Sequence, residues 1–282
     1  NNVLTLSGNF AYEIEEQPSM TNISALDSMG NLVSQCERAE ITEALNPKWQ
    51  YELQYKKDFK DHKEHTLLVS AIGNFFGKDQ SSDFENLATF GSAGNSFQQT
   101  ATNFSEARNT FQVDYTHPFA DKWKIETGAH YALQDVQNDY SVTDLVNEIW
   151  VADSGLTNVF EFGQNVLGVY GTSSYEGKKW GVKAGLRLEQ TDLNTLLATT
   201  GDANDQNYTN LFPSMHTSYK FNDKVSLQAG YSKRVYRPRM WDLNPFFNIR
   251  NNYNIFRGNP NLLPEYADSY ELTGIFLLKK AS

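Results

Sequence analysis

The stretch WGVKAGLRLE at residues 180–189 alternates between apolar and polar side chains along its whole length. The apolar positions are Trp180, Val182, Ala184, Leu186 and Leu188. The other parity carries Gly181, Lys183, Gly185, Arg187 and Glu189. A period of two predicts a β-strand with two chemically opposite faces. The period alone does not say whether the apolar face points into a soluble core or outward into a membrane.

The same alternation recurs in roughly ten segments along the chain. These segments are 3–15, 47–58, 63–76, 107–117, 122–137, 163–176, 179–191, 208–221, 224–237 and 265–279. Several of them exceed the five or six residues that are usual for globular strands and reach the ~9–11 residues of a tilted membrane strand. The pattern therefore predicts an all-β chain built from long strands.

The connections between these segments alternate in length. Short connections are expected at 59–62, 118–121, 177–178 and 222–223, and long loops at 16–46, 77–106, 138–162, 192–207 and 238–264. Short turns at one end and long loops at the other are typical of an outer-membrane barrel. We therefore predict an antiparallel up-and-down transmembrane β-barrel with its short turns on the periplasmic side.

Composition agrees with this interpretation. The mean hydropathy of −0.56 is usual for soluble proteins, but a barrel exposes only alternate residues to lipid. The net charge of −10 argues against a nucleic-acid partner, because phosphate binding requires clustered Lys and Arg. Cys36 is the only cysteine, so an internal disulfide is excluded.

Charged and aromatic residues separate along the strands in the same way. Lysines gather at the short-turn end, at positions 56, 57, 60, 63, 122, 124, 178, 179, 220, 224, 279 and 280, whereas the long loop 138–162 has acidic residues and no Lys or Arg. Aromatic residues stand near strand ends, as expected for two interfacial girdles, at Trp49, Trp123, Trp180, Phe221, Tyr236 and Trp241. We therefore expect the apolar parity to face outward and the polar parity to face the lumen.

Other functions receive less support from the sequence. The five histidines, His62, His65, His117, His130 and His216, all lie outside the expected long loops, so an outer-membrane protease site is disfavoured. His62 and His65 imply no third metal ligand. We expect no catalytic residue, no metal and no cofactor. A soluble β-sandwich or propeller that binds glycans remains an alternative.

The run from Tyr231 to Gly274 carries a distinctive motif. It contains Arg237-Pro238, then WDLNPF at 241–246 with Trp241, Asn244 and Pro245, then GNPNLLPE at 258–265 with Gly258, Asn259, Pro260 and Pro264. Together with GVKAGLRLEQTD at 181–192 and LFPSMHTSY at 211–219, this resembles outer-membrane barrels of the TonB-dependent receptor type common in Bacteroidota. One departure is Leu263, where that family usually has Lys.

The motif also has a local physical interpretation. Asn259-Pro260 and Leu263-Pro264 favour extended backbone before each proline, and Gly258 permits a sharp turn. Proline is tolerated at the first residues of a strand, so the motif could serve only to guide a long loop into the last strand.

The resemblance implies a parent barrel of about 22 strands with an N-terminal plug. Residues 1–282 would then be a partial barrel that lacks the plug and the closing strands. The implied partners are outer-membrane lipid, the plug of the parent chain, the TonB complex reached through the N-terminal part, and a surface lipoprotein. The implied function is solute binding and uptake across the outer membrane, and the alternative is a non-transporting surface scaffold.

A charged ladder is expected on the lumenal parity of neighbouring strands. Its members are Arg187, Glu189, Arg234, Glu265 and Glu271. Arg234 and Glu271 stand at comparable heights above the turn lysines, although barrel shear leaves their pairing open. Such residues would contact the plug, line the path of the solute, or only keep the lumen hydrated.

Overall fold

The computed structural model describes residues 1–91, 94–251 and 254–277. Its main feature is one eleven-stranded antiparallel sheet in the order β1-β2-β3-β4-β5-β7-β8-β9-β10-β13, with β6 paired to β5. The strands are β1 Asn2–Leu26, β2 Leu32–Asp58, β3 Thr66–Phe90, β4 Ser96–Ala120, β5 Trp123–Val146, β6 Ile149–Ala152, β7 Asn158–Glu176, β8 Trp180–Leu197, β9 Asp202–Asn222, β10 Val225–Tyr236 and β13 Glu265–Phe276. Helix α1 (Met240–Leu243) and the small hairpin β11 (Phe247–Asn251) with β12 (Asn254–Arg257) lie between β10 and β13.

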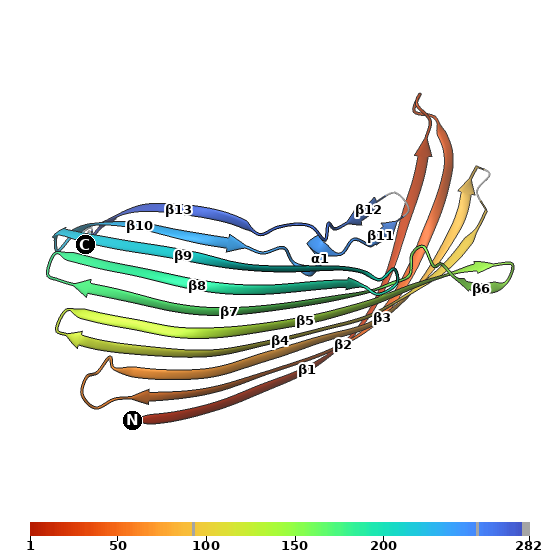
Figure 1. The fold of residues 1–282 in the computed structure, drawn as a ribbon. Coiled ribbons are helices and arrows are strands. Elements are labelled where there is room, and N and C mark those ends of the chain that lie inside the picture. The colour runs from red at the N-terminus through yellow and green to blue at the C-terminus, as the bar shows by residue number, and fades with distance from the viewer. Residues whose placement is uncertain (92–93, 252–253, 278–282) are drawn as a thin grey trace, which may run out of the picture.

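The sheet is curved and open (Figure 1). Neighbouring strands follow one another in sequence and pair antiparallel, which confirms the up-and-down topology predicted from the sequence. Edge strands β1 and β13 each pair with a single neighbour among the described residues. No helix in the described part of the chain is long and apolar enough to cross a membrane.

Four of the five predicted long loops are largely strand, so their prediction as loops was wrong. Residues 16–46 form the upper part of the β1–β2 hairpin, and 77–106, 138–162 and 192–207 likewise extend β3 to β9. Figure 1 shows the β1–β2 and β3–β4 hairpins bending away from the rest of the sheet at the end opposite the short turns. Outward-facing apolar residues alternate with inward-facing polar ones only in the part of the strands near the short turns, which we call the membrane belt. The backbone pairing continues above it.

The β1–β2 hairpin ends in a tight turn at residues 27–31. The Asp27 carboxylate accepts hydrogen bonds from the backbone amides of Met29 at 2.9 Å and Asn31 at 2.8 Å. Gly30 adopts φ +85°, a left-handed conformation that favours glycine. The Asn31 side chain, followed by its backbone amide, lowers the pKa of Asp27. A tight turn is thus encoded inside a stretch that was predicted as loop.

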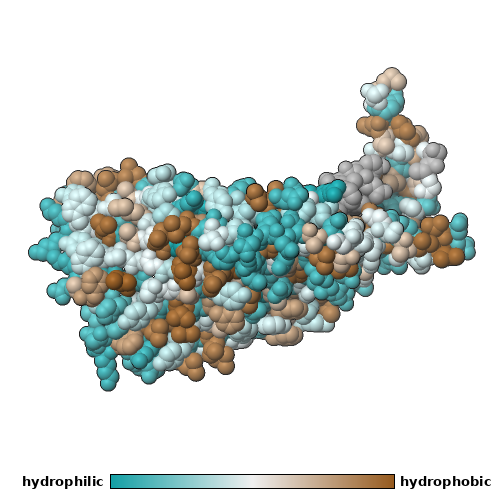
Figure 2. Space-filling model, viewed as in Figure 1, coloured by the Kyte–Doolittle hydropathy of each residue, from teal (hydrophilic) through white to brown (hydrophobic). Residues whose placement is uncertain are grey.

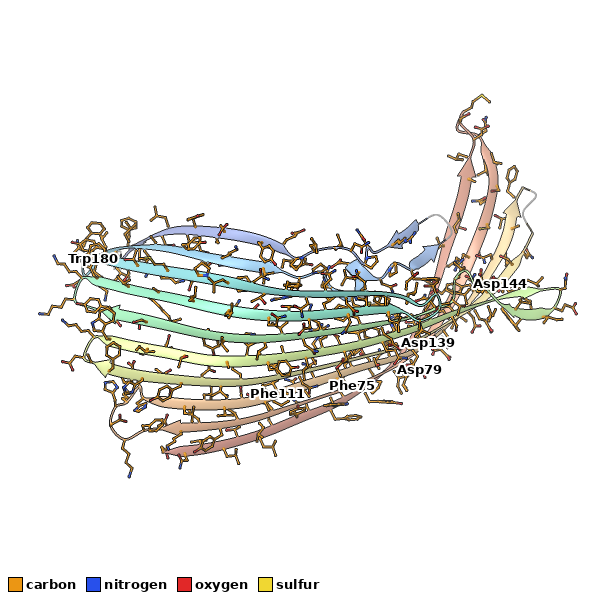
Figure 3. All side chains as sticks on the ribbon, viewed as in Figure 1. Phe75, Asp79, Phe111, Asp139, Asp144 and Trp180 are labelled. Atoms are coloured by element: carbon orange, nitrogen blue, oxygen red, sulfur yellow. The ribbon has the colours of Figure 1, made fainter. Side chains whose placement is uncertain are left out.

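The lower part of the sheet turns its apolar parity outward, as predicted. On β8, the side chains of Leu186 and Leu188 are 50% and 45% exposed, whereas Glu189 on the other parity is 4% exposed. In Figure 3, the labelled Trp180 lies at the short-turn end, Phe111 and Phe75 follow along the sheet, and the labelled acidic residues lie beyond them toward the bent hairpins. Figure 2 shows hydrophobic patches over the strands and a hydrophilic margin at the short-turn end.

The upper part of the same strands reverses this arrangement. Here the inward parity carries the apolar residues, and they form the main buried cluster with α1. Its members are Val136, Phe160, Phe162, Leu193, Leu197, Met240 and Leu243, with Phe104 and Phe246 packed against them. Helix α1 packs against inward-facing residues of strands β4 to β8. It therefore lies on the concave side of the sheet.

Two predicted girdle residues have other positions. Trp241 lies in α1 and stacks on Phe104 with ring centroids 5.8 Å apart. Tyr236 pairs with Glu265 on the parity of Arg234, which is the inward one. The prediction that these two belong to a lipid-facing girdle was therefore wrong, whereas Trp123 and Trp180 do point outward at the short-turn end. Lys279 and Lys280 lie outside the described residues.

Candidate functional site

A buried charge cluster lies on the inner wall beneath α1. Its centre is Glu189 on β8, whose side chain is 4% exposed. One carboxylate oxygen lies 2.9 Å from Nε of Arg187, and the other accepts a hydrogen bond from Arg237 at 2.5 Å. His130 Nε2 lies 3.8 Å from the same carboxylate. Two guanidinium groups therefore compensate the burial of one carboxylate, which would otherwise carry a large desolvation penalty.

The strand register explains why these groups meet. His130, Gly168, Glu189 and Asn210 form one inward-facing row across β5, β7, β8 and β9. A Cβ on Gly168 would lie 2.2 Å from the His130 ring, so the absence of a side chain gives the imidazole its place. Arg237 reaches the row from just beyond β10, where its NH2 group also donates to Thr191 Oγ1 at 3.2 Å.

The inner wall at the cluster, and on β7 above it, contains buried hydrogen-bond donors without a partner. Within the described residues, Gln164 Nε2, Asn210 Nδ2 and Arg237 Nε are buried and have no hydrogen-bond partner. A buried N–H without an acceptor is destabilising, so its presence in a native structure requires an explanation. No group of three potential metal ligands occurs in the described part of the chain.

Below the cluster, a polar lattice continues along the inner wall toward the short turns. Lys183 forms an ion pair with Glu126, which also lies 3.4 Å from Lys124. Tyr170 donates to Asp114. A cavity of about 500 Å³ lies at this end, with Lys183 and Glu271 in its lining. The inner wall is therefore charged and polar between the short turns and the α1 core.

The segment 237–246 holds α1 across the concave side. Pro238 is buried, Leu243 is fully buried, and Asn244 is 8% exposed. The backbone amide of Arg239 donates to the Asp242 carboxylate at 2.9 Å and lowers the pKa of that group. The segment thus combines an ion pair at Arg237 with apolar anchors at Met240 and Leu243. We call residues 237–246 the strap.

The two halves of the sequence motif contact each other. The amide of Gly258 donates to the Asn244 carbonyl at 2.8 Å, and the amide of Asn259 donates to the Asp242 carbonyl at 2.8 Å. A Cβ on Gly258 would lie 2.6 Å from the Asn244 carbonyl oxygen. Glycine is required here by close backbone approach, and its φ lies outside the left-handed region.

The remaining motif residues connect this contact to the sheet. The Pro260 carbonyl accepts hydrogen bonds from Asn204 and, at 3.3 Å, from Gln206, both on β9. Pro245 follows Asn244 at the end of the strap, and Pro264 directly precedes β13. The position of Pro264 agrees with the strand-entry interpretation.

The structure brings some of the expected ladder together and leaves one member apart. Arg187 and Glu189 lie in the central cluster, and Arg234 NH2 lies 3.3 Å from Glu271 Oε1 on the neighbouring strand. Both members of the latter pair are more than half exposed. Glu265 is exposed and has no ion pair among the described residues; its cross-strand neighbour is Tyr236.

Sequence reasoning missed three members of the site. His130, Gln164 and Asn210 all occupy polar parities of predicted strands, and this was the signal that could have placed them on the inner wall. Arg237 was selected as a motif residue, but its partner Glu189 lies 48 residues away in sequence. That pairing depends on the strap folding inward.

Comparisons with known proteins agree with this geometry. The model of the outer membrane protein beta-barrel family matches residues 57–281. Among solved structures, the chain is similar to the copper transporter OprC, with a TM-score of 0.52 and 12% identity over 99% of this chain and 50% of that one. The siderophore receptor PiuA from Acinetobacter baumannii gives a TM-score of 0.45 and 10% identity over 97% of this chain and 52% of that one. No curated protein sequence matches significantly.

At these identities the similarity to OprC shows the fold, and the chain spans about half the length of that protein. The prediction of a partial antiparallel outer-membrane β-barrel is therefore confirmed. The family match covers most of the chain and assigns it to the outer membrane. The chain belongs to the outer membrane protein beta-barrel family.

Proposed function

We propose that this chain forms part of the wall of a TonB-dependent import receptor. In this proposal a solute binds on the extracellular side and crosses the outer membrane along the inner face of the sheet. The family assignment and the OprC-like fold support a barrel that serves transport. The chemical identity of the solute is a separate question, because fold similarity does not determine it.

The observation that carries the proposal is the buried charge cluster around Glu189. A buried ion pair is weak grounds for stability, since apolar residues of similar volume often stabilise a fold as well. A buried Glu189 with Arg187 and Arg237 is expected where the wall contacts a polar partner. The unpaired donors of Asn210 beside it, and of Gln164 farther up β7, support the same reading.

The proposal includes the parts that complete such a receptor. The sheet has two open edges in the described residues and covers half of OprC, which supports a parent barrel of about 22 strands. We propose that residues 1–282 are a partial barrel domain, that a plug domain of the parent chain occupies the lumen, and that TonB acts through that plug. A surface lipoprotein is a further proposed partner.

The test uses the full-length protein in its own outer membrane. Cells with the wild-type gene, with a gene deletion and with a TonB deletion are grown in the same medium, and solutes depleted from the medium are profiled by mass spectrometry. We expect the two deletions to abolish depletion of the same solute. A Glu189→Gln variant at unchanged surface abundance should reduce that depletion, whereas Arg234→Ala should leave it close to wild type.

A non-transporting surface scaffold predicts a different result. In that case the gene deletion removes binding at the cell surface, but the TonB deletion leaves solute depletion unchanged. This result would contradict the transport proposal while leaving the barrel assignment intact.

A further inference from the structure

The lipid-facing side of the sheet is hollowed near its short-turn end. A groove of about 350 Å³ runs across strands β1 to β7 on the outward parity. Its lining is almost entirely apolar, with Ala71 and Ala129 between the larger side chains of Leu53, Phe111 and Tyr131. Two adjacent cross-strand rows supply these residues, so the groove follows directly from the register. Its apolar lining suits a hydrocarbon chain.

A cation stands directly below this groove. Lys57 lies two residues from Tyr55 on the same outward parity, in the row of Leu67 and Tyr115. Its ammonium group lies 4.6 Å from the centre of the Phe59 ring and forms no ion pair with any described residue. The neighbouring Lys56 points to the other face, where it lies 3.1 Å from Asp58. Only one of these adjacent lysines therefore carries an uncompensated charge on the lipid side.

A rigid aromatic platform supports Lys57. The ring of Phe59 stacks on buried His65 with centroids 4.0 Å apart. The two ring nitrogens of His65 lie 2.7 Å from the Asp61 carboxylate and 2.9 Å from the Tyr115 hydroxyl. These contacts connect the short turn to β4 and restrain the ring beneath the ammonium group. Lysine and aromatic rings at the edge of an apolar surface are favoured at a lipid headgroup interface.

We propose that this surface is a binding site for one phospholipid of the inner leaflet. One acyl chain occupies the groove lined by Ala71 and Ala129, and the phosphate lies beside the Lys57 ammonium group. The short turns of outer-membrane barrels lie on the periplasmic side, so the charged end of the site is at the height of inner-leaflet headgroups. The groove continues the membrane-facing surface of this outer-membrane chain, and the free lysine complements an anionic phosphate.

The experiment is native mass spectrometry of the full-length protein, titrated in detergent with a phosphatidylglycerol that carries palmitoyl and oleoyl chains. We expect one lipid to remain bound to the wild type. Ala71→Phe fills the groove and should remove most of this bound species. Lys57→Gln should weaken retention roughly fivefold, the order expected for one lysine near an anionic headgroup.

Matched variants separate this site from general detergent replacement. Ala184→Phe places the same ring on the outward face of β8 beyond the groove, and Lys56→Gln removes the paired lysine on the opposite face. Both should retain the lipid as the wild type does. Added inorganic phosphate should not displace the lipid, because phosphate lacks the acyl chain that fills the groove. Equal retention by all variants, or equal loss in Ala184→Phe and Ala71→Phe, would overturn the proposal.

Discussion

The lower and upper halves of the same strands bury opposite faces. On β8, Leu186 and Leu188 point outward, whereas Leu193 and Leu197 point inward and are 2% and 7% exposed. The next three outward positions above Leu188 are polar, at Gln190, Asp192 and Asn194, and Gln190 and Asp192 form hydrogen bonds along the outer surface. We interpret the change of face as the point where the strand leaves the hydrocarbon layer.

The surroundings of each half account for the difference. In the membrane, hydrocarbon covers the outer face and polar side chains line the lumen, so apolar side chains face outward. Above the membrane, water reaches the outer face, and apolar side chains are stable only when packed inside against the strap. Which parity is apolar is therefore set by the medium outside the strand, while the β-strand pairing remains the same throughout.

The largest effect is expected where the two halves meet, at Glu189. Replacing it with Ala leaves the guanidinium groups of Arg187 and Arg237 without their shared acceptor in a buried position. We expect the free energy of unfolding to fall by about 3–5 kcal/mol. Glu126→Ala, at a more exposed carboxylate on the same wall, should cost about 1 kcal/mol. Urea unfolding of the full-length protein in phospholipid vesicles measures both, and equal losses would contradict the special position of Glu189.

The apolar anchor of the strap, Leu243, should stabilise the upper half. Leu243 is fully buried in the upper core, so Leu243→Ala should cost about 2–5 kcal/mol through lost contacts and a cavity. Leu263→Ala, at a side chain that is 71% exposed, should change stability by less than about 0.5 kcal/mol. The same unfolding assay, combined with proteolysis of the extracellular hairpins, would detect loosening above the belt. Unchanged stability in Leu243→Ala would show that the strap is dispensable.

An arginine scan along the outward face of β8 locates the border between the halves. Leu186→Arg places a charge in hydrocarbon and should cost about 2–4 kcal/mol, whereas Gln190→Arg lies above the belt and should cost about 0–1 kcal/mol. The measurement is folding into vesicles at a series of urea concentrations. A similar penalty at both positions would place the border elsewhere.

The smallest effect is expected for the exposed pair of Arg234 and Glu271. Each side chain is more than 60% exposed, so Arg234→Ala should reduce stability by less than about 1 kcal/mol, and high salt should reduce even that difference. Unfolding at low and high ionic strength tests this. A loss comparable with that of Glu189→Ala would mean that the lumenal pair is buried by a part of the parent protein, which would revise its assignment as a solvated contact.

The sequence alone was sufficient to predict an all-β fold, the up-and-down order of its strands and the apolar outer face of the membrane belt. Alternation over residues 180–189 is a local property, and lipid exposure follows from it once the loop lengths favour a barrel. The polar parity also identified Arg187 and Glu189 as inward residues. The upper hairpins were missed because strands in water lack the outward-apolar pattern, although Asp27 and Gly30 marked one of their turns.

Tertiary structure alone decided what the inward residues contact. Arg237 meets Glu189 because the strap folds into the concave side, and Gly258 is needed because the backbone of residues 242–244 lies against it. A two-residue alternation cannot predict either contact, because each joins residues that are far apart in the sequence. Alternation determines the two faces of a strand, whereas register and curvature determine which side chains on a face come within reach.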